Sequence, residues 1–248
     1  MSSQAASGGV VTRFLPAGET ALVVEFGTTI DLATNERVLA FDRALAQAQI
    51  EGIVETVPTY RSVMVHYDPS IVEPQQLLER LRSLPTAVTA ERKIRRWIVP
   101  VCYAPSLAED LEYVSRTLGI PPERVVALHS GTIYRIYMYG FAPGFAYLGG
   151  LSPELAISRR LTPRPKAEAN SILIAGGQAL ITTVPMPTGW YVLGRTPERF
   201  FSITREPVFL AEVGDQVQFD PIDEATFATL AERAENGEVI ARVTDPVR

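Results

Sequence analysis

The chain has 248 residues, a formal net charge of −5 at pH 7, 46% hydrophobic and 21% charged residues, one cysteine and two histidines. These proportions are typical of a globular protein and exclude a disordered or fibrous chain. One cysteine cannot form an internal disulfide, and the cysteine and histidines together are too few for a usual four-ligand zinc site. The negative charge argues against nucleic acid as a partner, and no apolar run reaches the roughly 18 residues of a membrane span. We therefore expect a cytoplasmic protein, and the N-terminus lacks the features of a signal peptide.

The first part of the chain predicts a small α/β domain over residues 10–88. An apolar run within 12–25 fits a two-stranded hairpin, and Asp31 can cap a helix that runs to about Gln49. Two further strands are predicted at 53–57 and 62–67, and a second helix after Pro74. The order β-β-α-β-β-α suits one sheet with helices on one face.

A basic stretch at 85–96 indicates a linker, and a second domain is predicted over residues 94–244. Ser106 and Glu109 have the spacing of a capping box that would start a helix, and a further helix follows Pro121. The later chain predicts short strands separated by Gly and Pro, which is typical of a β-barrel, and a last helix. The expected ranges are 97–101, 132–139, 171–175, 180–184, 190–193, 208–210 and 216–219 for strands, and 226–234 for that helix.

Three features of the second domain could carry chemistry. The segment from Gly140 to Leu151 combines aromatic residues with Pro-Gly and Gly-Gly, and predicts a shaped loop rather than a helix or a regular strand. A pair of glycines at 176–177 could let a ligand approach the backbone closely, but the signal is weak and a plain hairpin is the favoured interpretation. A positive cluster, Arg159, Arg160, Arg164 and Lys166, could hold a carboxylate or phosphate or could be a solvated loop.

His129 is the candidate general base, because histidine titrates near neutral pH. A structural histidine that caps carbonyl groups at a helix end, where a cation suits the helix dipole, is the more common situation. Cys102 has no basic neighbour in the sequence that would lower the pKa of its thiol, so we do not expect a nucleophile.

The order of these motifs resembles one known family over nearly the whole chain: the B-type subunit of the bacterial 5-oxoprolinase complex, also described as allophanate hydrolase subunit 1 or the Kip inhibitor family. The resemblance rests on His129 followed by the segment Gly140-Phe141-Ala142-Pro143-Gly144-Phe145-Ala146-Tyr147-Leu148, on Thr162-Pro163-Arg164, Gly176-Gly177-Gln178, Pro187, Gly189-Trp190, Gly194-Arg195-Thr196-Pro197 and Gly214-Asp215.

The resemblance implies an α+β protein, with a small N-terminal α/β domain and a C-terminal cyclophilin-like β-barrel. It implies a polypeptide that is inactive alone and pairs with a C-type partner, of the allophanate hydrolase subunit 2 type. Together these would use ATP with Mg²⁺ to activate 5-oxoproline, a small-molecule substrate, and an A-type partner would complete hydrolysis to glutamate. Two alternatives stay open: a regulator that inhibits a sporulation-type histidine kinase, and a carboxyltransferase subunit of a urea or allophanate-type biotin enzyme.

By this resemblance we expect a site shared with the partner. Arg164 and Arg195 would hold a carboxylate or phosphate, and His129 would move or orient a proton. The remaining expected site residues would bind and shape the substrate: Pro143, Gly144, Phe145, Tyr147, Gly176, Gly177, Gln178 and Trp190.

The sequence departs from the usual family pattern around this predicted site. Leu173, Ala179, Leu180, Thr182, Thr183 and Thr188 replace residues that are commonly Gly, Thr, Gly, Tyr, Pro and Gly. Each lost glycine adds a side chain to a wall that faces the ligand. These changes bear on the substrate more than on the fold.

Overall fold

The computed structural model describes residues 12–85 and 93–244. The chain divides into two compact units, residues 1–92 and 93–248. The predicted domain limits at residues 10 and 88, and most of the predicted linker, lie outside the described residues. No described helix is long and apolar enough to cross a membrane.

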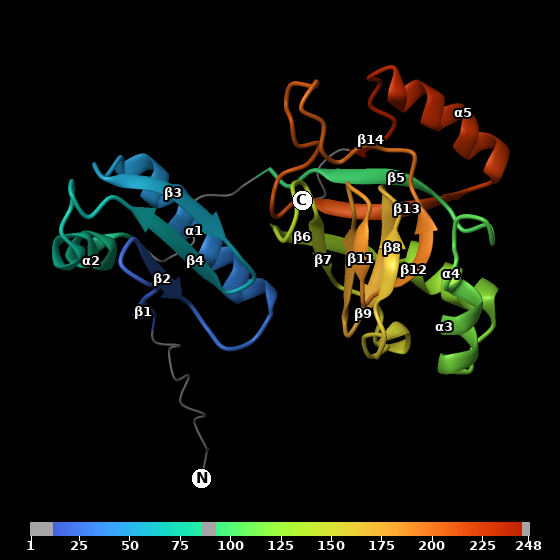
Figure 1. Ribbon diagram of the computed structural model, residues 1–248, viewed down its shortest axis with the longest axis horizontal. Helices are drawn as coiled ribbons and strands as arrows, with labels where there is room; N and C mark the ends of the chain where they lie inside the picture. Colours follow the sequence, from blue (N-terminus) through green and yellow to red (C-terminus); the bar gives the residue numbers. More distant parts are fainter. Residues whose placement is uncertain (1–11, 86–92, 245–248) are drawn as a thin grey trace, which may run out of the picture. The chain divides into compact units, whose positions relative to one another are not determined.

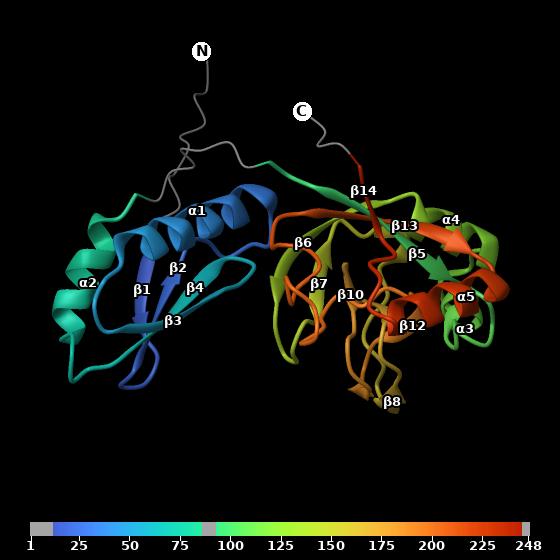
Figure 2. The same cartoon turned by 90° about the horizontal axis from the view of Figure 1, so that it is seen from above.

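The first unit is a four-stranded antiparallel sheet in the order β1-β2-β4-β3 with two helices (Figures 1 and 2). Its apolar core combines one face of β2 and β4 with both α1 and α2, so the helices cover the same face of the sheet. The elements are β1 (Arg13–Pro16), β2 (Ala21–Glu25), α1 (Leu32–Ala48), β3 (Ile53–Pro58), β4 (Ser62–Tyr67) and α2 (Pro74–Ser83).

Local signals in the sequence set the ends of these helices. The carboxylate of Asp31 accepts a hydrogen bond from the backbone N–H of Thr34 at 2.8 Å, which satisfies one of the N–H groups left over at a helix start. Pro74 begins α2, where its missing N–H costs no hydrogen bond. Leu77 and Leu81, one turn apart on α2, are fully buried against the sheet.

The second unit is a closed seven-stranded β-barrel in the order β12-β9-β10-β7-β6-β13-β5, and β5 also pairs with β12 (Figure 1). Strand β13 runs parallel to β5, and the other pairs are antiparallel. Strand β14 extends the sheet beside β5, and β8 and β11 form a separate two-stranded ribbon. The strands are β5 (Arg96–Cys102), β6 (Ile133–Tyr139), β7 (Ala146–Gly149), β8 (Arg164–Ala167), β9 (Ser171–Ala175), β10 (Gln178–Ile181), β11 (Met186–Thr188), β12 (Tyr191–Arg195), β13 (Gln216–Ile222) and β14 (Arg242–Thr244).

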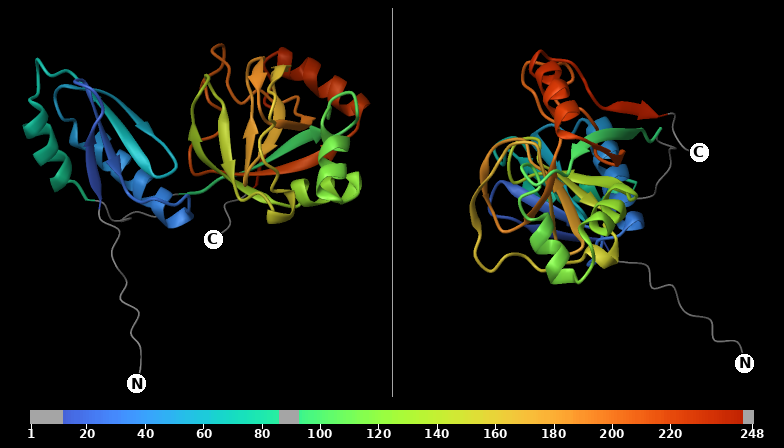
Figure 3. Two further views of the ribbon diagram at one scale, coloured as in Figure 1. Left: turned by 60° about the horizontal axis from the view of Figure 1, so that its bottom comes forward. Right: turned by 90° about the vertical axis from the view of Figure 1, so that its right-hand side faces the viewer.

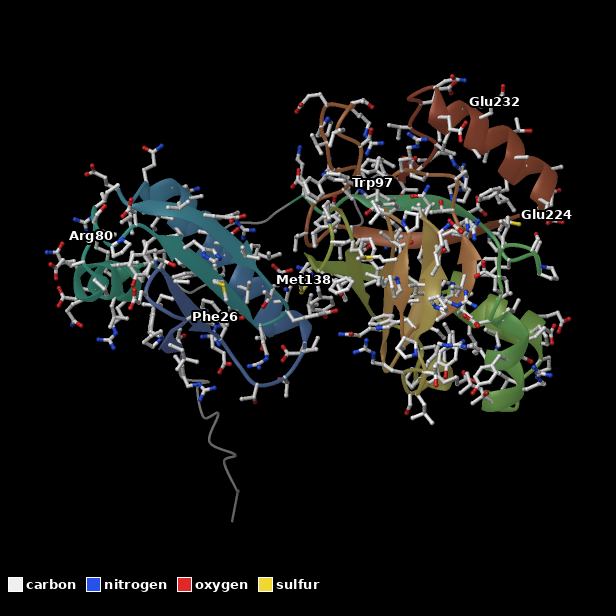
Figure 4. The ribbon with its side chains drawn as sticks, in the orientation of Figure 1. Phe26, Arg80, Trp97, Met138, Glu224 and Glu232 are labelled. Atoms are coloured by element: carbon white, nitrogen blue, oxygen red, sulfur yellow. The ribbon has the colours of Figure 1, made fainter. Side chains whose placement is uncertain are left out.

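In the described part of this unit, three α-helices flank the barrel, and a 3-10 turn (Pro153–Leu155) lies between β7 and β8. In Figure 3, α3 (Leu111–Leu118) and α4 (Pro122–Ser130) lie together on one side of the barrel, in green, and α5 (Glu224–Glu235), in red, lies on another. Helix α5 packs loosely against β5, with Ala234 its buried residue, and Glu232 points away from the barrel (Figure 4). The predicted α+β class with a small α/β unit and a β-barrel is confirmed.

Two buried carboxylates fix distant segments of the barrel unit. The carboxylate of Glu198 accepts hydrogen bonds from the backbone N–H groups of Ile240 and Ala241, both at 2.6 Å. The carboxylate of Asp215 accepts from the Trp97 indole at 3.2 Å and from Arg95 at 3.1 Å. Both side chains are fully buried, so these bonds compensate for the loss of water around the charge.

Some predicted elements were wrong. The capping box at Ser106 does not form, because α3 begins at Leu111 and the Ser106 hydroxyl instead donates to Glu224. Part of the predicted loop is strand β7, which pairs with both β6 and β10. Residues 208–210 form no strand, and Phe209 makes one isolated bridge to Phe201.

Candidate functional site

The barrel unit contains an open cavity of about 460 Å³ beside the Phe141–Phe145 loop. Its wall is mainly apolar, which is the usual character of a small-molecule pocket. The lining residues are Phe141, Phe145, Tyr147, Arg159, Pro163, Ala167, Leu173, Leu180, Thr182, Met186, Pro187, Thr188, Gly189 and Trp190.

The loop at the cavity edge is held in an unusual backbone conformation. Phe141 has φ of 69°, a left-handed value that is costly for a side chain of this size, and its ring is 75% exposed. Gly144 has φ of 74°, and a Cβ at this position would overlap Phe201. The Thr183 hydroxyl donates to the carbonyl oxygen of Pro143. The loop is thus fixed from outside, and it presents Phe141 at the cavity.

Two aromatic side chains form one wall of the cavity. The rings of Tyr147 and Trp190 meet edge to face with centroids 6.1 Å apart, and the backbone N–H of Trp190 donates to the Thr188 hydroxyl at 3.1 Å. Burial raises the pKa of Tyr147 above its usual value, against a smaller opposing effect of Arg159. Tyr147 therefore keeps its proton at neutral pH and can act as a hydrogen-bond donor.

Arg159 supplies the positive charge of the cavity. Its side chain lines the cavity and makes no ion pair or hydrogen bond with any other described residue. Thr182, also in the lining, is already engaged, since its hydroxyl donates to the carbonyl of Glu168 at 3.0 Å and accepts from the N–H of Ser171 at 2.9 Å. None of the described carboxylates lines the cavity.

The neighbouring arginines are held by two carboxylates outside the cavity. Arg164 contacts Glu109 at 2.7 Å and Asp110 at 3.2 Å, and Arg195 contacts Glu109 at 3.1 Å. Arg160 contacts Asp110 at 2.8 Å. Asp110 is 5% exposed and also accepts the N–H of Val192 at 2.8 Å, so the cluster ties the start of α3 to β12. The structure brings the predicted pair Arg164 and Arg195 together, but around Glu109 rather than at the cavity.

The paired glycines lie in the turn between β9 and β10. Gly176 has φ of 60°, and a Cβ at Gly176 or Gly177 would meet no atom within 4 Å. Gln178 pairs with Ala175 across the hairpin, so the hairpin interpretation describes this turn. The N–H of Gly176 donates to the carbonyl of Ile157 at 2.6 Å. None of the three residues lines the cavity.

His129 lies in the core of the barrel unit, and the structure does not bring it to the cavity. It is fully buried, stacks on Phe219 with centroids 4.8 Å apart, and its Nδ1 lies 2.8 Å from the Tyr103 hydroxyl. Its Nε2 has no hydrogen-bond partner among the described residues. Burial lowers the pKa of His129 to about 3, so the ring is neutral at physiological pH.

Of the predicted site residues, Phe145, Tyr147 and Trp190 line the cavity, and Pro143 and Gly144 shape its edge. Arg159 belongs to the positive cluster seen in the sequence, but nothing in the sequence distinguishes it from its neighbours as a site residue. The departures from the family pattern are a further signal, because four of those positions lie in the cavity wall. They are Leu173, Leu180, Thr182 and Thr188.

A family model described as "Carboxyltransferase domain, subdomain C and D" matches residues 12–211. The chain belongs to this family. Curated relatives named as the B subunit of 5-oxoprolinase include those of Bacillus subtilis, 32% identical over 88% of this chain and 95% of the relative, and Haemophilus influenzae, 34% identical over 84% and 96%. These relatives confirm the resemblance seen in the sequence.

Solved structures agree with this assignment. The crystal structure of TTHA0988 is 34% identical with a TM-score of 0.74, and the match covers 82% of this chain and 40% of that longer chain. An uncharacterized protein from Pyrococcus horikoshii is 36% identical with a TM-score of 0.51, over 87% of this chain and the whole of that one. The urea carboxylase of Kluyveromyces lactis, at 19% identity and a TM-score of 0.77, shares the fold. This chain spans 24% of the urea carboxylase.

Proposed function

We propose that this chain is the B-type subunit of an ATP-dependent complex that activates 5-oxoproline for hydrolysis to glutamate. The observation that carries the proposal is the end-to-end match to relatives named as the B subunit of 5-oxoprolinase, at 32–34% identity over 93–96% of their length. Because those names describe one subunit, they indicate partner chains. We propose a homologue of the C-type subunit as the direct partner and an A-type partner as the chain that completes hydrolysis, all in the cytoplasm.

The character of the cavity favours 5-oxoproline over urea. Urea is uncharged and polar throughout, and would gain little from the apolar surface of Phe141, Pro163 and Met186. The ring methylenes of 5-oxoproline suit that surface. A urea amidolyase of Lachancea kluyveri is only 22% identical in sequence, and this chain covers 14% of that protein. A urea-type carboxyltransferase is therefore the weaker alternative.

ATP and Mg²⁺ belong to the complex in this proposal. Among the described residues, no group of three or more His, Cys, Asp or Glu side chains is placed to hold a metal ion. Tyr147 and Arg159 are the large polar side chains of this chain that line the cavity, so the chain's own part would be to bind and orient the substrate. ATP supplies the phosphoryl group that activates the ring amide.

The test is co-expression of the chain with homologues of the C-type and A-type partners. We expect ATP hydrolysis and glutamate formation that depend on 5-oxoproline and require this chain. Urea should not replace 5-oxoproline. An intact complex without 5-oxoproline-dependent ATP hydrolysis would contradict the proposal, and carboxylation of urea when a biotin carboxylase and its biotin carrier are added would favour the carboxyltransferase alternative.

A further inference from the structure

We infer that Arg159 binds the carboxylate of the substrate and so selects a ligand with one negative charge and a compact, uncharged body. The inference rests on the proposed function, because it assigns one end of 5-oxoproline to a particular side chain. The proposed function alone does not assign this residue, and the sequence indicated Arg164 and Arg195 as the carboxylate-binding residues instead.

The ion pairs near the cavity distinguish Arg159 from the arginines beside it. Arg160, Arg164 and Arg195 are each within 3.2 Å of a carboxylate oxygen of Glu109 or Asp110. Arg159 has no such partner among residues 12–85 and 93–244, and no acidic side chain of these residues lines the cavity with it. An anionic ligand would therefore meet an uncompensated guanidinium without displacing an existing ion pair.

Hydrogen bonds hold the backbone on both sides of Arg159. On one side, the carbonyl of Ile157 accepts the N–H of Gly176 at 2.6 Å, and on the other, the N–H of Arg160 donates to the carbonyl of Gly189 at 2.8 Å. A Cβ placed on Gly189 would lie 3.5 Å from the guanidinium nitrogens, so the guanidinium lies against a bare stretch of backbone in the cavity wall. These contacts fix where the long side chain starts and what it lies on.

The rest of the cavity wall determines which kind of uncharged group the ligand can carry beside its carboxylate. The apolar side chains of the lining that keep exposed surface are Phe141, Pro163, Met186 and Pro187, and the buried Phe145 and Trp190 lie beside them in the wall. A bare inorganic anion such as phosphate would gain nothing from this surface, whereas a small ring or aliphatic chain would bury its carbon atoms there.

The binding test uses the full chain and follows its tryptophan fluorescence, to which Trp190 in the cavity wall and the distant Trp97 contribute. The probes are 5-oxoproline, 2-pyrrolidinone, which is the same ring without the carboxylate, and inorganic phosphate. We expect Arg159→Ala to weaken 5-oxoproline binding about tenfold to hundredfold, the range for loss of a hydrogen bond to a charged group. Binding of 2-pyrrolidinone should not change, and phosphate should bind more weakly than 5-oxoproline.

Two further variants make the effect specific. Arg159→Lys keeps the charge but loses the planar fork of donors, so we expect an intermediate affinity for 5-oxoproline. Arg116→Ala removes an exposed arginine on α3 that does not line the cavity, and it should leave affinity unchanged.

The same variants in the assembled complex separate this inference from the proposed function. We expect Arg159→Ala to raise KM for 5-oxoproline and to abolish the preference for 5-oxoproline over 2-pyrrolidinone. A wild-type complex that does not turn over 5-oxoproline would end the proposed function, while the binding test would still decide the role of Arg159. Wild-type affinity for 5-oxoproline in the Arg159→Ala variant, or no binding of 5-oxoproline by either the chain or the complex, would overturn the inference.

Discussion

Arg159 and Arg160 are adjacent in the sequence, and the fold gives them opposite surroundings. Arg160 is held by Asp110 at 2.8 Å and lies over the Tyr191 ring, 5.4 Å from its centroid. Arg159 lines the cavity and has no charged partner among the described residues. The difference separates cations that hold the barrel together from a cation that is available to a ligand. The number of arginines in a segment therefore says little about anion binding until the carboxylates that already occupy them are known.

The largest effect should come from removing Asp110, the carboxylate that binds both Arg160 and Arg164. We expect Asp110→Ala to lower the free energy of unfolding by about 3–5 kcal/mol, because the buried N–H of Val192 and the partly buried guanidinium groups of Arg160 and Arg164 lose this partner. Denaturant unfolding followed by tryptophan fluorescence reports on this unit, since Trp97 and Trp190 both lie in it. The control Glu154→Ala breaks the exposed pair with Arg124 and should cost about 0.5 kcal/mol. Equal losses in the two variants would contradict the assignment.

The Phe141–Phe145 loop should be more sensitive to substitution than the turn at Gly176 and Gly177. Gly144→Ala is expected to cost about 2–4 kcal/mol, because the new Cβ overlaps Phe201 in a left-handed backbone. Gly176→Ala has a similar positive φ but open space, so we expect a loss of roughly 1 kcal/mol. The same unfolding measurement compares the two. A larger loss at Gly176 would show that the packing of the loop is not what Gly144 provides.

His129 should make the free energy of unfolding depend on pH through its burial in the core, away from the cavity. Its pKa is about 3 in the folded chain and about 6.5 when unfolded, so the unfolded chain binds the extra proton. The stability that the neutral His129 contributes is complete well above pH 6.5 and falls as the pH drops toward 3, with a loss of about 1.6 kcal/mol between pH 6.5 and pH 5. Unfolding at these two pH values should show a much smaller loss in His129→Phe. Parallel pH profiles for the two proteins would contradict the effect.

The smallest effect on stability should come from Arg159 itself. Because its side chain is exposed and has no partner among the described residues, Arg159→Ala should change the free energy of unfolding by less than about 0.5 kcal/mol. The melting temperature of the variant checks this directly. A marked loss of stability would show that Arg159 stabilises the fold as Arg160 does. That result would contradict the inference that Arg159 is available to bind the substrate carboxylate.

The sequence predicted those elements whose ends are set by local contacts. Asp31 caps α1 through a residue three positions away, and Pro74 starts α2. The Ser106 and Glu109 capping box failed because both side chains have partners far along the chain, Glu224 for one and Arg164 and Arg195 for the other. Distant partners of this kind leave no local pattern.

One glycine of the segment from Gly140 to Leu151 was predicted in the wrong kind of element, again because its partner is distant in the sequence. The motif placed Gly149 in a loop, but Gly149 ends strand β7, where a Cβ would overlap the Tyr137 ring. The aromatic residues of the cavity were predictable from sequence motifs, because Phe145, Tyr147 and Trp190 stand in recognisable segments. The choice of arginine was not, since it depends on Glu109 and Asp110, about 50 residues earlier in the chain.

The parallel pairing of β5 with β13 has a consequence for how the protein folds. Gln216 lies opposite Arg96, and the two are separated by 120 residues. The barrel therefore cannot close until nearly all of its chain has left the ribosome, whereas the first unit is complete after about 85 residues. Such non-local pairing is slow, because the entropy of the long loop is lost before the contacts form. We expect the first unit to fold during synthesis while strands of the unfinished barrel stay exposed to chaperones.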